Sequence, residues 1–348
     1  MRAITVTPGK AQSARLDDVA EPEPGDGTVL VQTLAVGVCG TDLEIVEGKY
    51  GWAPAGQDRL IIGHESLGRV VEAQPESGFE TGDWVVGIVR HPDPVPCASC
   101  AAGEWDMCRN GQYTERGIKA LPGFASERYR SAPDHLVKVD AKLGDLGVLL
   151  EPTSVVAKAW EHTERIGGRA LWKPRRVLVT GAGPIGLLAA LLGVQRGLEV
   201  HVLDRAEAGV KPALVRALGA SYHTGSVLEA GEAWDVVFEC TGAASLLFEV
   251  IRAAAPDGIV CLTGVGSGGR TLPVDAGALN RELVLENNVV FGSVNANRRH
   301  YQQAAEALAR ADADWLNRII TRRVPLDRWA EAFQRQPGDG KTVITFGG

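Results

Sequence analysis

The stretch Val177-Leu178-Val179-Thr180-Gly181-Ala182-Gly183-Pro184-Ile185-Gly186 decides the fold. Four residues suited to a buried strand run into the pattern Gly-x-Gly-x-x-Gly, and the mostly apolar segment 187–194 continues as an expected helix. In such a turn Gly181 permits the tight exit from the strand, Gly183 lets a pyrophosphate approach the backbone, and Gly186 allows close packing of helix on sheet. The helix N-terminus offers free N–H groups to the phosphates. The stretch therefore predicts a dinucleotide-binding turn.

A second strand, Glu199 to Leu203, follows this turn and ends in Asp204. An acid at this distance from the glycines is typical of a residue that binds the adenosine ribose. From Arg176 onward strand and helix patterns alternate, which predicts an α/β fold with a parallel, doubly wound sheet. The expected segments are strands 177–180, 199–203, 234–239, 259–263 and 289–294, and helices 185–195, 212–218, 244–254 and 300–311.

The region before this sheet has a different pattern. Strand candidates 29–38, 67–73 and 84–89 are punctuated by Gly and Pro, which predicts a β-rich, partly closed, barrel-like domain. The closing segment 342–346 is a further strand candidate, and we expect it to return to this first domain. The sequence therefore predicts a β-rich first domain from residues 1–155 and 301–348, and a Rossmann nucleotide-binding domain over residues 156–300.

Composition narrows the class of protein. The 348 residues include 45% hydrophobic and 23% charged residues, which is ordinary for a globular protein of about two domains. The net charge of −7 argues against non-specific binding to nucleic acid or to anionic membranes. The N-terminus looks like a first strand and not like a signal peptide, so we expect a cytoplasmic protein with reduced thiols.

Three short motifs in the first half carry candidate metal ligands. Cys39 ends a predicted strand, Gly63-His64-Glu65 precedes another, and Glu151 lies at the expected domain junction. A thiolate, an imidazole and a carboxylate suit zinc with one coordination position left open. Zinc in such a site acts as a Lewis acid on an alcohol oxygen. Each residue alone is weak evidence, but beside a dinucleotide fold the set predicts a catalytic zinc.

A second candidate metal site lies in the irregular segment 91–117, which we call the lobe. Its cysteines are spaced Cys97-x2-Cys100-x7-Cys108, which is typical of a structural zinc site. Such a site needs four ligands, and the fourth is expected to be Asp93 or a nearby acid such as Asp106. The alternative is a metal-free lobe with reduced thiols.

These motifs together resemble the zinc-dependent medium-chain alcohol dehydrogenases, and most closely their glucose dehydrogenase branch. The resemblance covers essentially the whole chain. The glycine turn and Gly63-His64-Glu65 are shared by the broad family. The sugar-oxidising branch is indicated by the stretches 112–117 (Gln-Tyr-Thr-Glu-Arg-Gly), 151–154 (Glu-Pro-Thr-Ser) and 294–297 (Val-Asn-Ala-Asn).

The resemblance implies roles by position. Cys39 and His64 would hold the catalytic zinc, with Glu65 and Glu151 as ligands directly or through water. Thr41 would hydrogen-bond the reacting hydroxyl and pass on its proton. The sugar pocket would be lined by Arg90, Glu115, Glu151 and Asn295.

The chain departs from the family pattern at two positions. The first of four lobe cysteines is replaced by Pro94, which makes neighbouring Asp93 the expected substitute ligand of the structural zinc. Glu44 stands where the family's alcohol dehydrogenases often have a proton-relaying histidine. Any proton relay in this chain must therefore differ.

Later strands of the doubly wound sheet add further cofactor contacts. Thr241 follows one predicted strand, and Gly264 and Val265 follow the next, at positions that face the cofactor crevice in such folds. Pro184, Ile185 and Val294 complete the expected cofactor-binding set. The remaining histidines are expected to be structural or surface residues: His91, His135, His162, His201, His223 and His300. Cys240 and Cys261 follow or end apolar strands and are expected to be buried.

The choice between NAD and NADP depends on two adjacent residues. Asp204 would accept hydrogen bonds from the ribose hydroxyls and repel a 2′-phosphate, which favours NAD. Arg205 could bind that phosphate or stack on the adenine. Because Ala206 follows in place of a second basic residue, we predict that NAD is preferred and NADP is used less well.

The function predicted from the sequence is oxidation of an aldose at C1, with β-D-glucose as the expected substrate and an aldonolactone as product. A polyol or secondary-alcohol dehydrogenase of the same family is the first alternative, and a non-catalytic dinucleotide-binding redox sensor is a remote one. The resemblance also implies a homodimer or homotetramer.

Overall fold

The computed structural model describes residues 1–266, 268–269, 271–336 and 338–347. The chain divides into two compact units, one formed by Met1–Ser154 with Asn295–Gly348 and the other by Val155–Val294. The first boundary is one residue before the expected one, and the second lies at Asn295 where residue 301 was expected. The stretch 294–297 therefore spans the second boundary, and Asn295 belongs to the first unit.

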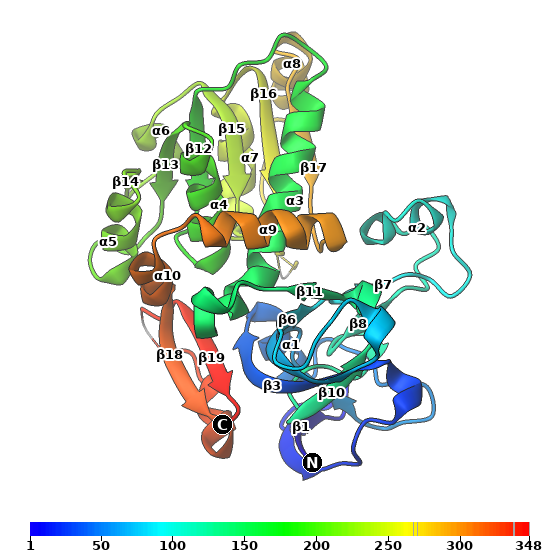
Figure 1. The fold of residues 1–348 in the computed structure, drawn as a ribbon. Coiled ribbons are helices and arrows are strands. Elements are labelled where there is room, and N and C mark those ends of the chain that lie inside the picture. The colour runs from blue at the N-terminus through cyan, green and yellow to red at the C-terminus, as the bar shows by residue number, and fades with distance from the viewer. Residues whose placement is uncertain (267, 270, 337, 348) are drawn as a thin grey trace. The chain divides into compact units, whose positions relative to one another are not determined.

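The Val155–Val294 unit contains one parallel six-stranded sheet in the order β14-β13-β12-β15-β16-β17 (Figure 1). The strands begin on the central β12 and progress outward on both sides, so the predicted doubly wound fold is confirmed. Their bounds are β12 Arg176–Thr180, β13 Glu199–Leu203, β14 Ser221–His223, β15 Trp234–Glu239, β16 Ala254–Leu262 and β17 Val289–Gly292.

Helices connect these strands and cover the sheet. The central strands are buried on both faces, which explains why their sequences are continuous apolar runs without alternation. Helix α4 packs on β12 and β13, and α7 packs on β15 and β16. Helix α8 was not expected from the sequence, because none of its residues is fully buried and its apolar pattern is weak. The helices are α3 Leu150–Gly167, α4 Pro184–Gln195, α5 Val210–Ala217, α6 Val227–Ala230, α7 Ala244–Arg252 and α8 Ala276–Leu285.

The other unit is built around a seven-stranded, mostly antiparallel sheet in the order β11-β6-β5-β3-β19-β18, with β10 also paired to β3. The C-terminal strand β19 pairs with β3 in the register Thr342↔Val38, so the expected return of the chain end is confirmed. The strands are β3 Val29–Val38, β5 Glu65–Ala73, β6 Trp84–Gly87, β10 Arg128–Ser131, β11 Leu136–Lys138, β18 Ile320–Pro325 and β19 Lys341–Thr345.

Two three-stranded sheets and several short helices complete this unit. Side chains from all parts of the large sheet share one core, which includes Val31, Phe124 and Ile344. The smaller sheets contain β1 Arg2–Val6, β2 Arg15–Asp18 and β4 Leu60–Ile61, and β7 Arg90–His91, β8 Thr114–Arg116 and β9 Ala120–Leu121. The α-helices are α1 Gly40–Val46, α2 Ala98–Ala101, α9 Arg298–Ala309 and α10 Ala313–Ile319. The 3-10 segments are Pro24–Asp26, Pro75–Ser77, Trp105–Met107, Pro133–His135, Ala141–Leu149 and Leu326–Phe333.

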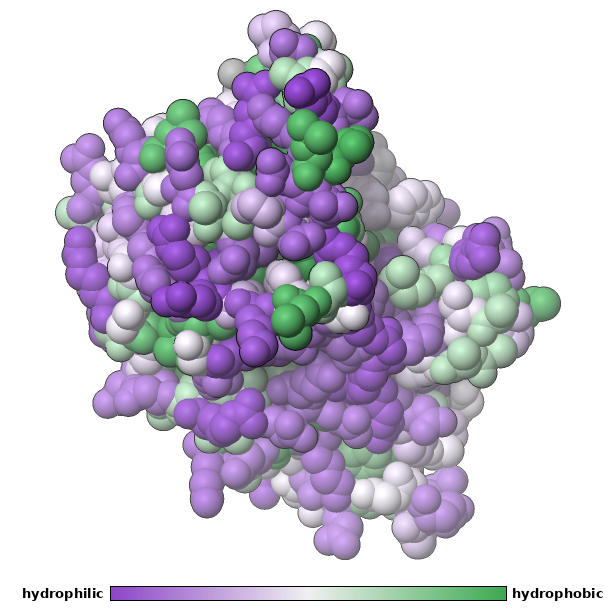
Figure 2. All heavy atoms as spheres, turned by 90° about the horizontal axis from the view of Figure 1, so that it is seen from above, coloured by the Kyte–Doolittle hydropathy of each residue, from purple (hydrophilic) through white to green (hydrophobic). Residues whose placement is uncertain are grey.

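Among the described residues, no helix is both long enough and apolar enough to cross a membrane. Figure 2 shows hydrophilic side chains over most of the face that it displays, with small separate groups of hydrophobic ones. Scattered exposed hydrophobic residues of this kind are normal for a folded chain.

Candidate active site

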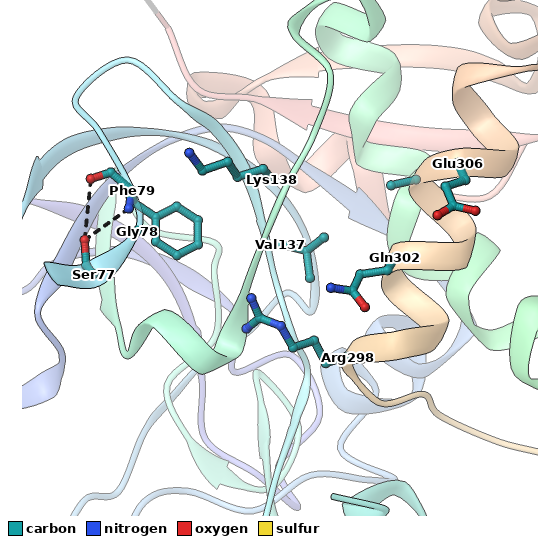
Figure 3. Close-up of a pocket in the computed structure, with 9 residues that line it drawn as sticks. Ser77, Gly78, Phe79, Val137, Lys138, Arg298, Gln302 and Glu306 are labelled. Carbon is teal, nitrogen blue, oxygen red and sulfur yellow. Dashed lines mark hydrogen bonds between the residues drawn. The ribbon is translucent and has the colours of Figure 1, made fainter.

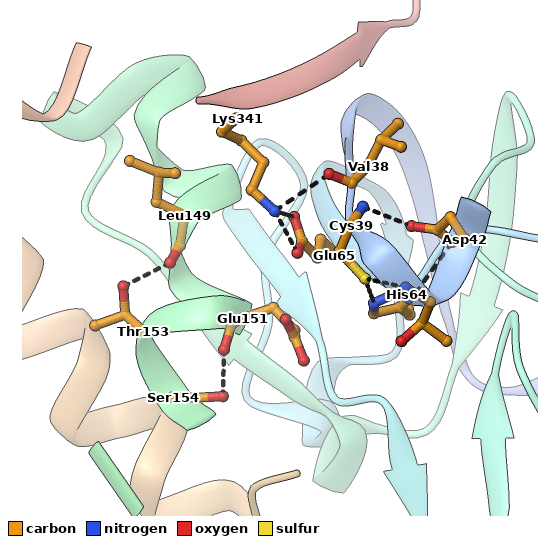
Figure 4. A network of polar contacts seen from close by, with 11 residues as sticks. Val38, Cys39, Asp42, His64, Glu65, Leu149, Glu151, Thr153, Ser154 and Lys341 are labelled. Atoms are coloured by element: carbon orange, nitrogen blue, oxygen red, sulfur yellow. Dashed lines mark hydrogen bonds and ion pairs between the residues drawn. The ribbon is translucent and has the colours of Figure 1, made fainter. Parts of the chain in front are cut away.

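The predicted zinc ligands Cys39 and His64 lie next to each other (Figure 4). Cys39 follows β3 and is the N-cap of α1, and its Sγ atom is 3.0 Å from Nε2 of His64. The backbone N–H of Thr41 donates to the same sulfur at 3.2 Å. The end of a buried strand and the start of a helix thus fix the thiol in place.

Asp42 orients both of these residues, and the sequence analysis missed it. Its Oδ1 atom is 3.2 Å from Nδ1 of His64, and its Oδ2 atom accepts the backbone N–H of Cys39 at 2.9 Å. Although burial alone would lower it, the carboxylate of Asp42 and then the thiol of Cys39 raise the pKa of His64 well above 6.5. A carboxylate on Nδ1 leaves Nε2 directed at the ligand position, as is usual for a metal-binding histidine. The spacing Cys39-x-x-Asp42, typical of a helix N-cap and its N3 residue, is the signal that could have found it.

Glu65 is held by a second residue that was not predicted, Lys341. Both carboxylate oxygens of Glu65 are 2.6 Å from Nζ of Lys341, which also donates to the carbonyl of Val38 at 3.3 Å. The two side chains are 2% and 3% exposed. A Cβ atom on Gly37 would lie 2.0 Å from Oε2 of Glu65, so only glycine leaves room for the carboxylate there. The ligand atoms of Cys39, His64 and Glu65 all lie within 4.8 Å of one another.

Glu151 lies near this group but outside it. It is the second residue of α3 and is buried, and burial together with the nearby Glu65 carboxylate raises its pKa to about 7. His64 and Lys341 act in the opposite direction on the same pKa. A divalent cation nearby would favour the ionised carboxylate. The donor set of thiolate, imidazole and carboxylates, with the imidazole already oriented by Asp42, fits zinc.

Three of the four predicted sugar-pocket residues also converge: Arg90, Glu115 and Asn295. Oε1 of Glu115 accepts from Nε and Nη2 of Arg90 at 3.0 and 2.9 Å and from Nδ2 of Asn295 at 2.7 Å. Asn295 reaches this position with a left-handed backbone conformation, φ 63°. The guanidinium of Arg90 lies 3.8 Å from the centre of the Tyr113 ring. Because three donors occupy one oxygen of Glu115, its second oxygen is the atom left for another hydroxyl.

The lobe brings its three cysteines together without the expected fourth ligand. The sulfurs of Cys97, Cys100 and Cys108 all lie within 4.8 Å of one another, and Asp93 is not part of that group. Instead, Oδ1 of Asp93 accepts the backbone N–H of Val95 at 2.8 Å. The Oδ2 atom of this buried side chain has no hydrogen-bond partner among the described residues. Backbone N–H groups, first that of Arg109, lower the pKa of Cys97 to about 6. The thiols thus fit a metal, and the role of Asp93 stays a prediction.

The dinucleotide turn has the geometry that its sequence requires. Gly181 has φ 92°, and a Cβ atom on Gly186 would lie 1.8 Å from the carbonyl oxygen of Gly181. Gly183 is the N-cap of α4 and has open space on its Cβ side, and Pro184 occupies the first turn. The backbone therefore leaves the start of α4 accessible to a phosphate.

Asp204 is more heavily engaged than the sequence indicated. Its carboxylate accepts the backbone N–H groups of Ala182 at 2.7 Å and Ala206 at 3.0 Å. Nζ of Lys211 lies 3.1 Å from Oδ2. Although burial acts against them, these N–H groups and then Lys211 lower the pKa of Asp204. Lys211 was not predicted, whereas Arg205 is exposed, as expected of a residue available to a ligand.

The other predicted positions are the expected cofactor contacts and the histidines and cysteines expected to have no role in the site. Thr241 and Gly264 lie in loops after β15 and β16, and Val265 and Val294 are strongly exposed for apolar residues. The rings of His91 and His135 stack at 3.8 Å, and His201 bonds His223 at 2.8 Å, so these four contact one another in pairs. Cys261 is buried, as expected, and Cys240 is partly buried.

The unit formed by Met1–Ser154 and Asn295–Gly348 also contains a cavity of about 410 Å³ away from the predicted site residues (Figure 3). The residues that line it include Phe79, Lys138 and Arg298. No predicted site residue lines it, so it does not belong to the candidate active site.

Comparison with known proteins gives the family. Residues 144–346 match the family described as "Glucose dehydrogenase C-terminus", and residues 25–141 match "Alcohol dehydrogenase GroES-like domain". The chain belongs to the glucose dehydrogenase branch of the zinc-dependent medium-chain alcohol dehydrogenases. The predicted family is thus confirmed.

Relatives in this family match over their whole length. A "Glucose 1-dehydrogenase" of Methanocella arvoryzae is 41% identical over 100% of both chains. Another from Thermoproteus tenax is 42% identical over 99% of both. A solved structure of Haloferax mediterranei glucose dehydrogenase "in complex with NADP, Zn and gluconolactone" has a TM-score of 0.92, 33% identity and 100% coverage of both chains.

Proposed function

We propose that this protein is a zinc-dependent glucose 1-dehydrogenase that transfers the C1 hydrogen of glucose as hydride to NAD or NADP and yields gluconolactone. The observation that carries the proposal is the convergence of Cys39, His64 and Glu65 within 4.8 Å, with Asp42 holding the first two and Lys341 the third. The relatives named glucose 1-dehydrogenase and the neighbour with zinc, NADP and gluconolactone support the same activity.

The residues of the site have separate roles in this reaction. Cys39 and His64 would hold zinc, with Glu65 and Glu151 as carboxylate ligands directly or through water. When bound, zinc supplies Lewis-acid chemistry that lowers the pKa of a hydroxyl. Thr41, at the start of α1, accepts the hydrogen bond of the C1 hydroxyl and passes on its proton.

The sugar is selected by fixed polar groups. The second oxygen of Glu115, the guanidinium of Arg90 and the amide of Asn295 form a preorganised set that hydrogen-bonds sugar hydroxyls. A buried polar group left without a partner costs about 1–3 kcal/mol, so a substrate lacking those hydroxyls is disfavoured. β-D-glucose is the aldose that we propose.

NAD is the preferred cofactor in this proposal, and NADP is accepted. The carboxylate of Asp204 is held beside the glycine turn, where it repels a 2′-phosphate. Lys211 offsets part of that charge, and exposed Arg205 offers a second cation. We therefore expect only a small ratio of kcat/KM for NAD to kcat/KM for NADP.

Metal and assembly complete the proposal. The three thiols of the lobe would hold a second, structural zinc, with Asp93, whose Oδ2 atom has no hydrogen-bond partner among the described residues, as the fourth ligand. The protein forms a homodimer or homotetramer, which the molar mass in solution tests.

The function is tested by two variants and a substrate panel. Cys39→Ala and His64→Ala should each abolish glucose oxidation and lower the zinc content, while NADH binding persists, because the dinucleotide turn lies in the other unit. Cys261→Ala removes a buried cysteine elsewhere and should change neither zinc content nor turnover. Retention of most of kcat without zinc in either site variant would refute the metal mechanism. Oxidation of a polyol but no aldose would point to a polyol dehydrogenase, and NADH binding without any turnover to a redox sensor.

A further inference from the structure

A buried carboxylate lies under the loops at the carboxyl edge of the doubly wound sheet. Glu239 is the last residue of β15 and is 3% exposed. Its Oε1 atom accepts the backbone N–H of Thr241 at 2.8 Å, the hydroxyl of Thr180 at 3.2 Å and the hydroxyl of Thr241. Its Oε2 atom accepts the backbone N–H of Gly242 at 3.1 Å. Among the residues that the structure describes, no cation pairs with this carboxylate.

The main chain of Glu239 holds a second loop. Its carbonyl oxygen accepts the backbone N–H groups of Thr263 at 2.8 Å and Gly264 at 2.9 Å, and the hydroxyl of Thr263 at 3.0 Å. A Cβ atom on Gly264 would lie 2.1 Å from the backbone nitrogen of Gly242 and 2.7 Å from Oε2 of Glu239. One residue therefore fixes both loops and packs them against each other.

Burial of a carboxylate among neutral donors is expensive unless every acceptor position is used. Here the donors are two consecutive backbone N–H groups and two hydroxyls. Their hydrogen bonds to the charged carboxylate therefore stabilise the backbone conformation of the loop 240–243. A neutral amide could not replace the carboxylate. Its NH₂ group would face the N–H of either Thr241 or Gly242, whichever way the amide is turned.

The position of these loops in the sheet indicates which part of the cofactor they meet. In a doubly wound fold the two halves of the sheet each take one mononucleotide of the dinucleotide. Strands β15, β16 and β17 lie on the side of β12 opposite to β13, the strand that Asp204 follows (Figure 1). The loops after β15 and β16 thus belong to the nicotinamide half.

We infer that Glu239 is a positioning residue that preorganises the loops 240–243 and 263–266 for the nicotinamide half of the dinucleotide. The inference rests on the proposed function, since it assumes that the protein binds NAD or NADP. Glu239 does not touch the cofactor in this scheme and acts through the backbone of Thr241, Gly242 and Gly264.

The test is the variant Glu239→Gln, measured by fluorescence titration with NADH and NADPH and by calorimetric titration with ADP-ribose. Loss of one loop N–H acceptor should weaken binding of the whole dinucleotide fivefold or more. Affinity for ADP-ribose, which lacks the nicotinamide, should change less than twofold. The KM for the cofactor should rise, while the zinc content and the KM for glucose at saturating cofactor stay as in the wild type.

Two further variants separate positioning from general stability. Glu229→Gln neutralises an exposed carboxylate of the same unit that also accepts a backbone N–H, and it should leave all affinities unchanged. Glu239→Asp keeps the charge but shortens its reach, and it carries the test if Glu239→Gln does not fold.

Each outcome has one interpretation. An NADH affinity within twofold of the wild type in a folded Glu239 variant overturns the inference, as does an equal loss of NADH and ADP-ribose affinity. A fall in melting temperature with unchanged affinities would assign Glu239 a purely structural role. Failure of the wild type to bind NADH or NADPH would instead refute the proposed function.

Discussion

Replacing Lys341 by methionine should destabilise the zinc-binding unit strongly. Methionine has a similar length and no charge, so the substitution removes the ammonium and leaves the packing volume nearly intact. Its partner Glu65 would then be a buried carboxylate whose oxygens bond no cation among the described residues, because both accept from Nζ of Lys341 at 2.6 Å. Breaking a buried pair in this way costs about 3–5 kcal/mol. For a unit of this size, that corresponds to a fall in melting temperature of roughly 6–20 °C.

The chain contains a matched control at the surface. Nζ of Lys49 is also 2.6 Å from a carboxylate, that of Glu47, but the two side chains are 70% and 55% exposed. Solvent screens this second pair, so Lys49→Met should change the melting temperature little. The two variants differ in burial and not in the distance between the charges.

Thermal unfolding of protein with and without zinc measures the effect. The loss in Lys341→Met should be larger without zinc, because a bound cation beside Glu65 replaces part of the missing charge. The double variant Lys341→Met/Glu65→Gln should regain most of the stability, since it no longer buries a lone charge. A melting temperature of metal-free Lys341→Met within 2 °C of the wild type would refute the reasoning, and so would a double variant less stable than the single one.

The remaining predictions concern cofactor, substrate, lobe and pH. Lys211→Ala should sharpen the preference for NAD over NADP about tenfold, which is ~1.4 kcal/mol, and Asp204→Ser should shift the ratio of kcat/KM values towards NADP by a similar factor. Asn295→Ala should lower kcat/KM for glucose more than for a small primary alcohol; equal losses would show that its amide does not contact the sugar. Asp93→Ala should reduce the metal content from two zincs per chain to one and lower thermal stability more than kcat, whereas one zinc in the wild type would contradict the lobe site. Burial lowers the pKa of His135 to about 4, so the unfolded state binds more protons and stability should fall as the pH drops from about 6.5 to 4; His135→Phe should flatten that dependence in melting curves.

Local sequence patterns predicted most of the fold because they report local physics. The strand 199–203 was predicted with its observed ends, since the β-branched and apolar residues Val200, Val202 and Leu203 lie between the acids Glu199 and Asp204. Helix α8 escaped prediction because it buries no residue completely. Patterns of this kind determine element types better than element ends, as the early start of β16 at Ala254 illustrates.

In the candidate site, too, residues in local sequence motifs could be predicted, and residues brought in by tertiary contacts could not. Cys39 and His64 could be predicted because each stands in a short motif whose chemistry is visible in the sequence. Lys341 could not, because its contact with Glu65 depends on the pairing of β19 with β3 and of β3 with β5. Lys211 likewise meets Asp204 only once α5 has folded back towards the end of β13.

Two buried carboxylates in this chain are satisfied in different ways, and the difference matches their proposed tasks. Glu65 is paired with a cation, and a buried ion pair of this kind contributes little net stability compared with apolar residues. Its retention is explained if the carboxylate must stay ionised and fixed beside a metal. In the part of the chain that the structure describes, no cation pairs with Glu239, which accepts from neutral N–H and O–H donors of the loop that follows it. A charge satisfied in that way determines backbone shape, which is what a loop facing a cofactor requires. Removing the charge should therefore impair metal retention at Glu65 and cofactor affinity at Glu239, and measuring both quantities on both variants separates the two functions.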